Sequence, residues 1–228
     1  MIFRRNWWAP VSLLILLLAL LTGMVLLLRH EPSSFRRAAI PPSPQRSQLS
    51  AEFYRQISTL LSLLTDPEPD KPWQLRLRQE QINSYLAEGF VESSLDRTEL
   101  PPGVRDPRVV LEPGLVRVSF RYGEGFWRVV VSLELRLWVS AAEPQVLLVQ
   151  IRRVRMGAVP VPVRYVQELL AHVLRRRNLE IIWYRYEGLP VAAIRFQSSR
   201  RAPTFHFTNL RLEAGEILVQ GRTLAAEN

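Results

Sequence analysis

The longest apolar run of the chain lies at residues 7–28 (WWAPVSLLILLLALLTGMVLLL), which contain no charged side chain. At about 1.5 Å of rise per residue, a helix of this length measures roughly 33 Å and can cross a bilayer core of about 30 Å. A tryptophan pair opens the run and arginines flank it on both sides, as is common at membrane interfaces. The pattern predicts one transmembrane helix over 7–28, preceded by a short tail at 1–6.

A cleaved signal peptide is the competing interpretation of this run. The apolar region of a signal peptide is about 7–15 residues long and is followed by small residues, whereas this run is longer and is followed by Arg29, His30 and Glu31. We therefore expect an uncleaved anchor. A literal count of the flanking arginines would place the rest of the chain in the cytoplasm, but large domains are translocated despite such a bias. The count does not decide the orientation, and we expect the extracytoplasmic face.

After the anchor the pattern changes twice. Residues 29–49 are rich in proline and serine and show no periodicity, which is typical of a tether. Ser50 then precedes a helical pattern over 51–64, as an N-cap residue would. The prolines of TDPEPDKP (65–72) end this helix. We expect the segment 50–228 to form a single domain.

The stretch QLRLRQEQINSYLAEGF (74–90) passes from a strand pattern into a helical pattern without a break. Leu75 and Leu77 alternate with polar residues, and the apolar residues that follow recur at helical spacing. The helical face consists of Ile82, Tyr85, Leu86 and Phe90. Asn83, a poor helix former, lies among them. It is expected either to hydrogen-bond nearby backbone or to be an ordinary exposed residue.

Strand patterns bounded by turn residues dominate the rest of the chain. The predicted strands are 107–112, 115–122, 126–139, 145–155, 179–187, 190–197, 204–212 and 216–221. The third of them would span roughly 46 Å at about 3.3 Å per residue, and it carries a long apolar row at alternate positions. This row consists of Val129, Val131, Leu133, Leu135, Leu137 and Val139.

An apolar helix provides a partner of matching length for this row. Pro162 suits the first turn of a helix, and the residues after it form an apolar stripe. The stripe consists of Val163, Val166, Leu169, Leu170, Val173 and Leu174. Three arginines at 175–177 end the helix; they could bind phosphate, but cations also suit the negative end of a helix dipole, and we favour that explanation. Together the patterns predict an α+β fold in which an elongated, curved antiparallel sheet wraps around long helices.

Composition restricts the chemistry without identifying it. The chain has no cysteine, which excludes disulfides, thiolate metal sites, a cysteine nucleophile and a lipidated cysteine. The net charge of +9 comes almost entirely from arginine and is compatible with nucleic acid, with an anionic membrane or with solvent alone. Aromatic and basic residues mix in LEIIWYRYEG (179–188), as on some nucleic-acid surfaces. Its two alternating apolar faces fit a covered strand better, so we expect no nucleic-acid partner.

Catalytic and metal-binding patterns are missing from the sequence. The three histidines, His30, His172 and His206, fit no metal-ligand spacing. Neither a phosphate-binding glycine loop nor a nucleophile elbow occurs. An acid/base pair assembled from carboxylates distant in the sequence stays open. We expect no enzymatic activity, no metal and no cofactor.

Two motifs carry a resemblance to a known family. LRLRQEQINSYL (75–86) resembles the strand followed by T-x-x-E-I-N-x-x-L, and LPPGVRDPRVVLEPGLVRVSF (100–120) resembles the L-P-G-V-x-D-x-x-V-x-L segment, of small membrane-tethered bacterial proteins of the YceB and YpmS types. The former belong to the tubular lipid-binding (TULIP) group. Arg78 stands where these proteins have threonine, and Gln81 where they have glutamate. The resemblance implies a TULIP-like fold in the bacterial cell envelope. Its signature residues here would be Ile82, Asn83 and Leu86.

Two functional hypotheses follow from these features. The first is a membrane-anchored, non-enzymatic lipid-binding or lipid-shuttling protein. Its acyl-chain ligand would lie in an apolar groove between the row of strand 126–139 and the helix after Pro162, with arginines at the mouth. The alternative is a membrane-anchored envelope scaffold that binds a protein partner, through an exposed edge strand, without a ligand.

Overall fold

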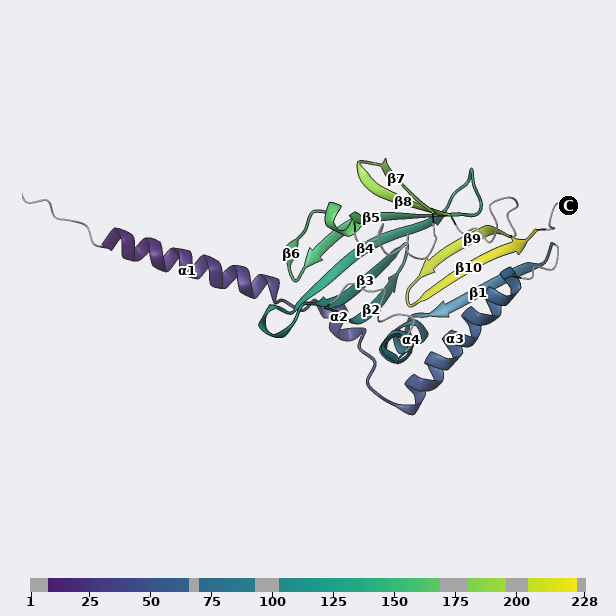
Figure 1. The fold of residues 1–228 in the computed structure, drawn as a ribbon, viewed down its shortest axis with the longest axis horizontal. Coiled ribbons are helices and arrows are strands. Elements are labelled where there is room, and N and C mark those ends of the chain that lie inside the picture. Colours follow the sequence, from purple (N-terminus) through teal and green to yellow (C-terminus); the bar gives the residue numbers. More distant parts are fainter. Residues whose placement is uncertain (1–7, 66–69, 93–102, 169–179, 196–204, 225–228) are drawn as a thin grey trace, which may run out of the picture.

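The computed structural model describes residues 8–65, 70–92, 103–168, 180–195 and 205–224, and shows an apolar helix projecting from one end of an α+β domain (Figure 1). The helices are α1 (Trp8–Leu28), α2 (Ser33–Arg37), α3 (Pro44–Thr65) and α4 (Gln79–Glu92), with a 3-10 helix η1 (Gly125–Trp127). The strands are β1 (Pro72–Arg78), β2 (Val104–Glu112), β3 (Leu115–Tyr122), β4 (Val129–Val139), β5 (Val146–Met156), β6 (Val159–Pro160), β7 (Glu180–Tyr186), β8 (Leu189–Arg195), β9 (Phe205–Glu213) and β10 (Glu216–Thr223).

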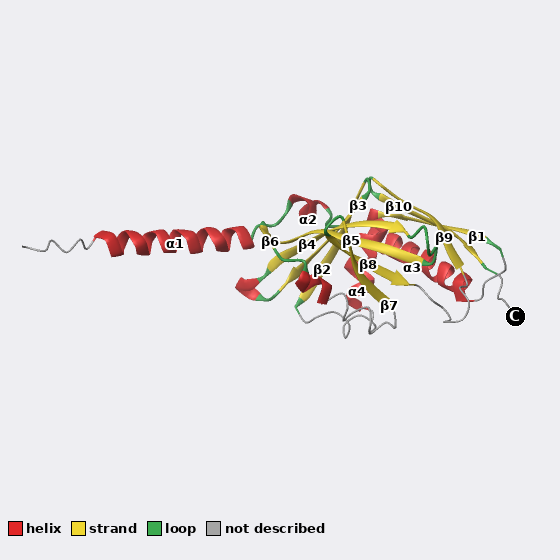
Figure 2. Ribbon diagram, turned by 90° about the horizontal axis from the view of Figure 1, so that it is seen from above, coloured by secondary structure: helices red, strands yellow, loops and turns green. Residues whose placement is uncertain are grey.

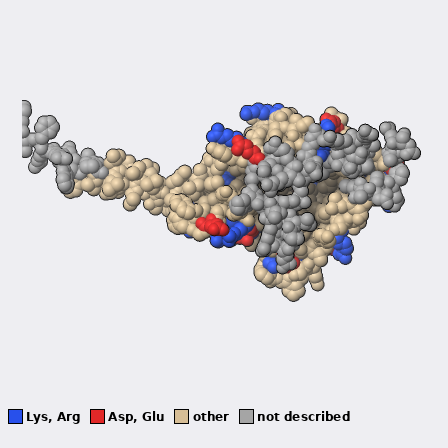
Figure 3. Space-filling model, in the orientation of Figure 1, with Lys and Arg blue, Asp and Glu red and all other residues tan. Residues whose placement is uncertain are grey.

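Helix α1 has the length and the surface of a membrane span. Its 21 residues correspond to about 32 Å of α-helix. Its apolar stretch is not buried against the rest of the protein, and Figure 3 shows it as a rod without charged side chains that leads away from the domain. The helix is therefore long and apolar enough to cross a bilayer, which agrees with the span predicted over 7–28.

All strand pairs are antiparallel and form two sheets. The small sheet has the order β1-β10-β9, and the large sheet has the order β2-β3-β4-β5-β8-β7, with β6 paired to β5. Most neighbours in the large sheet are successive hairpins, which is why strand alternation and turn residues predict the strands closely. The α+β class and the large antiparallel sheet are confirmed.

Side chains of α4 build the step from β1 into the helix. Arg78 ends β1, and its backbone N–H donates to Gln81 Oε1 (2.8 Å), as in one half of a capping box. Gln81 Nε2 donates in turn to Glu52 Oε2 of α3 (2.8 Å). The glutamine therefore caps α4 and also contributes a donor that ties α4 to α3.

Two other side chains of α4 complete the edge strand β2. Asn83 Nδ2 donates to the Val109 carbonyl (2.8 Å), and Asn83 Oδ1 accepts from the Val109 N–H (2.7 Å). One turn earlier, Gln79 Oε1 accepts from the Leu111 N–H (2.8 Å). Edge strands expose unpaired backbone groups, and α4 pairs those of β2. Asn83, which is 4% exposed, thus bonds backbone, and the exposed alternative is wrong.

The segment after α1 is folded onto the domain, unlike the free tether predicted for 29–49. It contains α2 and the first turns of α3. Phe35 of α2 is 1% exposed. The guanidinium of Arg108 lies 4.0 Å from the centre of the Phe35 ring and donates to the Phe35 carbonyl (2.7 Å). A helix of five residues is too short to show periodicity, so the prolines and serines around it concealed this contact.

Several predicted elements differ at their boundaries. The helix predicted over 51–64 begins at Pro44, so Ser50 lies inside α3 and is not its N-cap, and the strand predicted over 107–112 begins at Val104. The strand predicted over 126–139 begins at Val129, because η1 occupies the residues before it. Residues 159–160 form β6 and pair with β5. The helix predicted after Pro162 is observed over 164–168, and its continuation lies outside the described residues.

Candidate functional site

The apolar row of β4 lies in the core of the domain over part of its length. Val131 and Leu133 are buried in one cluster with Ile151 and Val154 of β5 and with Val166. The strand and the helix after Pro162 therefore meet, as the sequence predicts. In the part that the structure describes, they meet as a packed cluster.

The rest of the row is less deeply buried. Leu135 and Leu137 are half-buried, and they pack on a second cluster where β2, β3 and the small sheet meet. Val129 and Val139, at the two ends, are also half-buried. Val163 packs against the first cluster, and the other stripe residues, Leu169, Leu170, Val173 and Leu174, lie outside the described residues. The groove predicted between strand and helix therefore stays a prediction.

A groove that the sequence does not predict lies between α3 and β1, at the end of the domain remote from α1 (Figures 1 and 2). Its volume is ≈ 500 Å³. Leu60 and Leu63 come from α3, and Trp73 and Leu75 come from β1. We call it the α3–β1 groove. Its remaining lining residues are Arg55, Gln56, Thr59, Gln74 and Arg76.

Two residues that line this groove, Gln56 and Trp73, each carry a buried polar atom without a hydrogen-bond partner among the described residues, Gln56 Oε1 and Trp73 Nε1. The Trp73 side chain is held firmly. It is 7% exposed, and its ring meets the rings of Phe205 and Phe207 edge to face at 6.3 Å and 5.9 Å. Its indole also covers Gly221, where a Cβ would collide with the ring. A buried donor without a partner costs about 1–3 kcal/mol, so the Trp73 N–H is an unsatisfied group beside the groove.

The rim of the α3–β1 groove is positively charged. Arg55 and Arg76 line it, and none of the described lining residues is acidic. Arg76 forms an ion pair with Glu216, with 3.3 Å between Nε and Oε1, and its side chain stays 59% exposed. The groove therefore combines apolar walls with two arginines at its opening, which suits an amphiphile with an anionic end.

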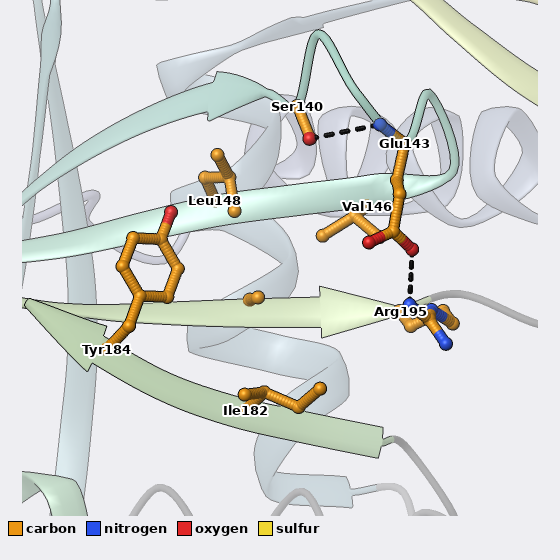
Figure 4. A pocket seen from close by; sticks show the side chains of 8 residues that line it. Ser140, Glu143, Val146, Leu148, Ile182, Tyr184 and Arg195 are labelled. Atoms are coloured by element: carbon orange, nitrogen blue, oxygen red, sulfur yellow. Dashed lines mark hydrogen bonds and ion pairs between the residues drawn. The ribbon is translucent and has the colours of Figure 1, made fainter.

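A smaller pocket, of ≈ 230 Å³, lies on the strands β5, β7 and β8 of the large sheet (Figure 4). Leu148 of β5 and Ile182 and Tyr184 of β7 form its apolar wall. The carboxylate of Glu143 accepts from Arg195 at one end of the pocket (Figure 4). Burial raises the pKa of the Tyr184 hydroxyl, and Tyr186 adds to that rise.

The strand beside this pocket is an edge of the large sheet. Among the described strands, β7 pairs with β8 alone. Its Ile182, Tyr184 and Tyr186 are 52%, 39% and 48% exposed. For strand 179–187, predicted as core or cavity wall, the core alternative is wrong for this row, whereas Ile182 and Tyr184 do line a pocket.

No group of three or more His, Asp or Glu residues in the described part of the chain is arranged to hold a metal ion. Of the groove residues, Leu60 lies on the apolar side that the pattern predicts for helix 51–64, whereas Leu63 was not assigned to that side. Trp73 was not predicted either, although it continues the alternation of Leu75 and Leu77 by one step. That continuation was the available signal.

Comparison of the chain with protein-family models, with curated proteins and with solved structures finds no match. The resemblance to the YceB and YpmS types therefore rests on the short motifs alone. Within these motifs, Asn83 bonds the edge of β2, Ile82 packs on the second core cluster and Leu86 is half-buried. These contacts explain the docking of α4 and do not bear on a ligand.

Proposed function

We propose that this chain is a membrane-anchored, non-enzymatic protein that binds the acyl chain of a lipid or fatty acid in the α3–β1 groove. One observation carries the proposal. The groove joins apolar walls, formed by Leu60, Leu63, Trp73 and Leu75, to a rim that carries Arg55 and Arg76.

Size and energetics support this class of ligand. The volume of ≈ 500 Å³ falls within the range of about 300–1,000 Å³ that is usual for small-molecule sites. Burial of an acyl chain contributes about 0.8 kcal/mol per CH₂, so a dozen buried carbons would offset the ordering of the ligand. A carboxylate or phosphate at the rim would meet Arg55 and Arg76.

The place of the groove supports movement of the ligand away from the bilayer. The groove lies at the far end of the domain from α1 (Figure 1). With α1 in the membrane, a bound acyl chain would be held outside the leaflet from which it came. This arrangement fits a protein that receives or hands over a lipid, and it requires no covalent chemistry.

Photolabelling tests the proposal on the full chain. The protein would be reconstituted in nanodiscs and given a palmitic acid that carries a diazirine on its chain. Labelled peptides would then be mapped by mass spectrometry. We expect labels in α3 and β1, around residues 55–63 and 73–76, in addition to labels in α1 from the bilayer itself. Labelling of α1 alone would refute the groove.

A matched pair of substitutions sharpens the test. Leu60→Glu places a charge on the apolar wall and should abolish labelling of β1. Leu61→Glu, one residue along the same helix, changes a side chain that is 58% exposed and does not line the groove, so it should leave the labelling unchanged. Equal loss in both variants would point to damage of α3 rather than loss of a site.

A protein-interaction scaffold is the second candidate, and the exposed row of β7 favours it. An edge strand with exposed apolar side chains can accept a strand from a partner. A photo-crosslinking amino acid placed at Tyr184 in cells should then yield one adduct of defined mass. The same amino acid at Ala142, an exposed turn residue, should yield none. Identical patterns at the two positions would remove this candidate.

A further inference from the structure

The end of the domain that meets α1 presents an exposed aromatic pair. At the tip of the β3–β4 hairpin, η1 carries Phe126 and Trp127, which are 58% and 74% exposed. Their rings meet edge to face at 5.6 Å. Gly123 shapes the tip with a φ of +89°, and a Cβ there would lie 2.8 Å from the Trp127 carbonyl oxygen. The backbone thus holds two large aromatic side chains outward.

Direct contacts place this tip beside the last turn of α1. The guanidinium of Arg29 lies 4.7 Å from the centre of the Phe126 ring. In the turn before β6, the Ala158 N–H donates to the Leu27 carbonyl (2.8 Å). Figure 1 shows both hairpin ends gathered where α1 meets the domain. With α1 across a bilayer, the aromatic pair would therefore lie at the level of the lipid head groups.

A basic pocket opens next to the aromatic tip. Its volume is ≈ 350 Å³, and its described lining residues include Arg29, Arg121 and Arg128 together with one acid, Glu31. The positive charge of Arg121 is already compensated, because its guanidinium donates to Glu31 (2.9 Å) and to Asp106 (2.7 Å).

The other two arginines of this pocket keep their charge available. Within the described part of the chain, neither Arg29 nor Arg128 forms an ion pair. Figure 3 shows basic and acidic side chains on the domain close to the point where the uncharged helix α1 ends. The pocket can therefore accept an anion without displacing an internal partner.

We infer that this end of the domain is a membrane-contact surface for an anionic phospholipid leaflet. Trp127 inserts at the head-group level, where an apolar ring with an N–H is favoured, and Phe126 beside it adds apolar surface that the acyl boundary can bury. Arg29 and Arg128 bind the lipid phosphate, for which the guanidinium fork is well matched. This surface lies at the opposite end of the domain from the α3–β1 groove. It requires only that α1 lies in the bilayer.

The absence of cysteine from the chain allows a direct test. A single cysteine replaces Trp127 in the full chain and is labelled with the environment-sensitive dye NBD. A second labelled variant, at Ala142 in the exposed turn after β4, serves as the control. Both are placed in nanodiscs of phosphatidylcholine, with or without phosphatidylglycerol. We expect the label at 127 to emit at shorter wavelength and to be quenched by spin-labelled lipid, most strongly in the anionic discs. The label at 142 should behave as in water.

Removal of the two available arginines isolates the head-group site. With Arg29→Gln and Arg128→Gln in the same chain, the extra response to phosphatidylglycerol should disappear, while unfolding of the domain stays unchanged. A label at 127 that is as water-exposed as the one at 142 in every disc overturns the inference. So does a response that is equal in both lipids and insensitive to the arginines. The fatty-acid photolabelling reports on α3 and β1, whereas the NBD emission reports on residue 127. A negative outcome in one experiment therefore does not imply a negative outcome in the other.

Discussion

Single side chains in this protein take over pairing that a neighbouring strand would normally provide. Asn83 satisfies both backbone groups of Val109, and Gln79 satisfies the N–H of Leu111. An amide side chain is suited to this, because it carries a donor and an acceptor side by side. Two amides on one helix thereby close the edge of the large sheet.

Replacement of Asn83 by alanine should destabilise the domain by about 2–4 kcal/mol, because a buried N–H and a buried C=O of Val109 lose their partners. Urea unfolding of the full chain in detergent, followed by tryptophan fluorescence, measures the change. Glu80→Ala, at an exposed position of the same helix, should change the free energy of unfolding by less than about 0.5 kcal/mol. A similar small effect at Asn83 would contradict the role of the amide.

Gly221 provides the second prediction for a single residue. A Cβ at this position would collide with the Trp73 ring and crowd the His206 carbonyl. Gly221→Ala should therefore lower stability by about 1–3 kcal/mol, the usual cost of overpacking, and should weaken fatty-acid labelling of β1. Gly23→Ala, in α1 where a Cβ meets nothing within 4 Å, is the matched control. Unchanged labelling in Gly221→Ala would show that the position of Trp73 does not matter for the ligand.

Helices α3 and α4 are joined by polar and aromatic contacts along their lengths. The rings of Phe53 and Tyr85 lie 4.7 Å apart. Near the other end of the pair, Glu88 Oε1 accepts from Arg46 Nε (2.8 Å) and from Ser47 Oγ (2.9 Å). Since α3 also forms one wall of the groove, this joint sets the position of that wall relative to α4.

The stability that Glu88 contributes to the contact between α3 and α4 should depend on pH. The hydrogen bond from Arg46, with that from Ser47 and the Arg46 charge, holds the pKa of Glu88 below its ordinary value of 4.5 although burial opposes this. A carboxylate with a lowered folded-state pKa stabilises the fold above its unfolded pKa, and that contribution is lost as the pH falls through the folded value. Glu88→Gln should therefore cost about 0.5–1 kcal/mol at neutral pH. The gap to wild type should narrow below pH ~4.3.

Urea unfolding of both proteins between neutral and acidic pH measures this dependence. Glu80→Gln changes an exposed carboxylate on the same helix and should track wild type across the range. A constant gap between Glu88→Gln and wild type at all pH values would mean that the charge of Glu88 is irrelevant to the joint.

Helices and strands could be predicted where a single hydrophobic period, helical or alternating, extends over enough residues. The alternation over 115–122 predicts β3 with its observed ends, and the step from alternation to helical spacing near 78 predicts the start of α4. Helix α2 has too few residues to show a period, and η1 interrupts an apolar row whose alternation continues through it. The α3–β1 groove was beyond reach for another reason. It joins Leu60 to Trp73, and Trp73 is positioned by pairing with Gly221, far along the chain.

At the scale of the whole molecule, the connection between helix and domain is rigid. Phe35 is clamped between the guanidinium groups of Arg108 and Arg121, 4.0 Å and 5.3 Å from the ring centre. Arg121 also holds Glu31 (2.9 Å). The short connection from α1 to α2 is thus fastened to β2 and β3.

Phe35→Ala should release this connection, because removal of a buried phenylalanine side chain costs about 3–5 kcal/mol where the site cannot collapse. We expect much faster amide hydrogen exchange over residues 29–43, with the sheets protected as before. Tyr54→Ala, which removes an aromatic ring that is 64% exposed, should leave exchange in that segment unchanged. Equal protection in wild type and Phe35→Ala would mean that the clamp does not hold the connection.

The clamp at Phe35 would also restrict the reach of the domain if α1 lies in a membrane. A free chain of the length of residues 29–49 would let the domain move over a radius of about 25 Å around its anchor. With α1 in a bilayer and the connection fastened to β2 and β3, the domain would instead keep one height and one tilt, and it would move sideways only as fast as α1 diffuses through the lipid. It would then contact only components at the same height above the membrane, so the distance between α1 and the α3–β1 groove would help to determine which components can exchange a ligand with it.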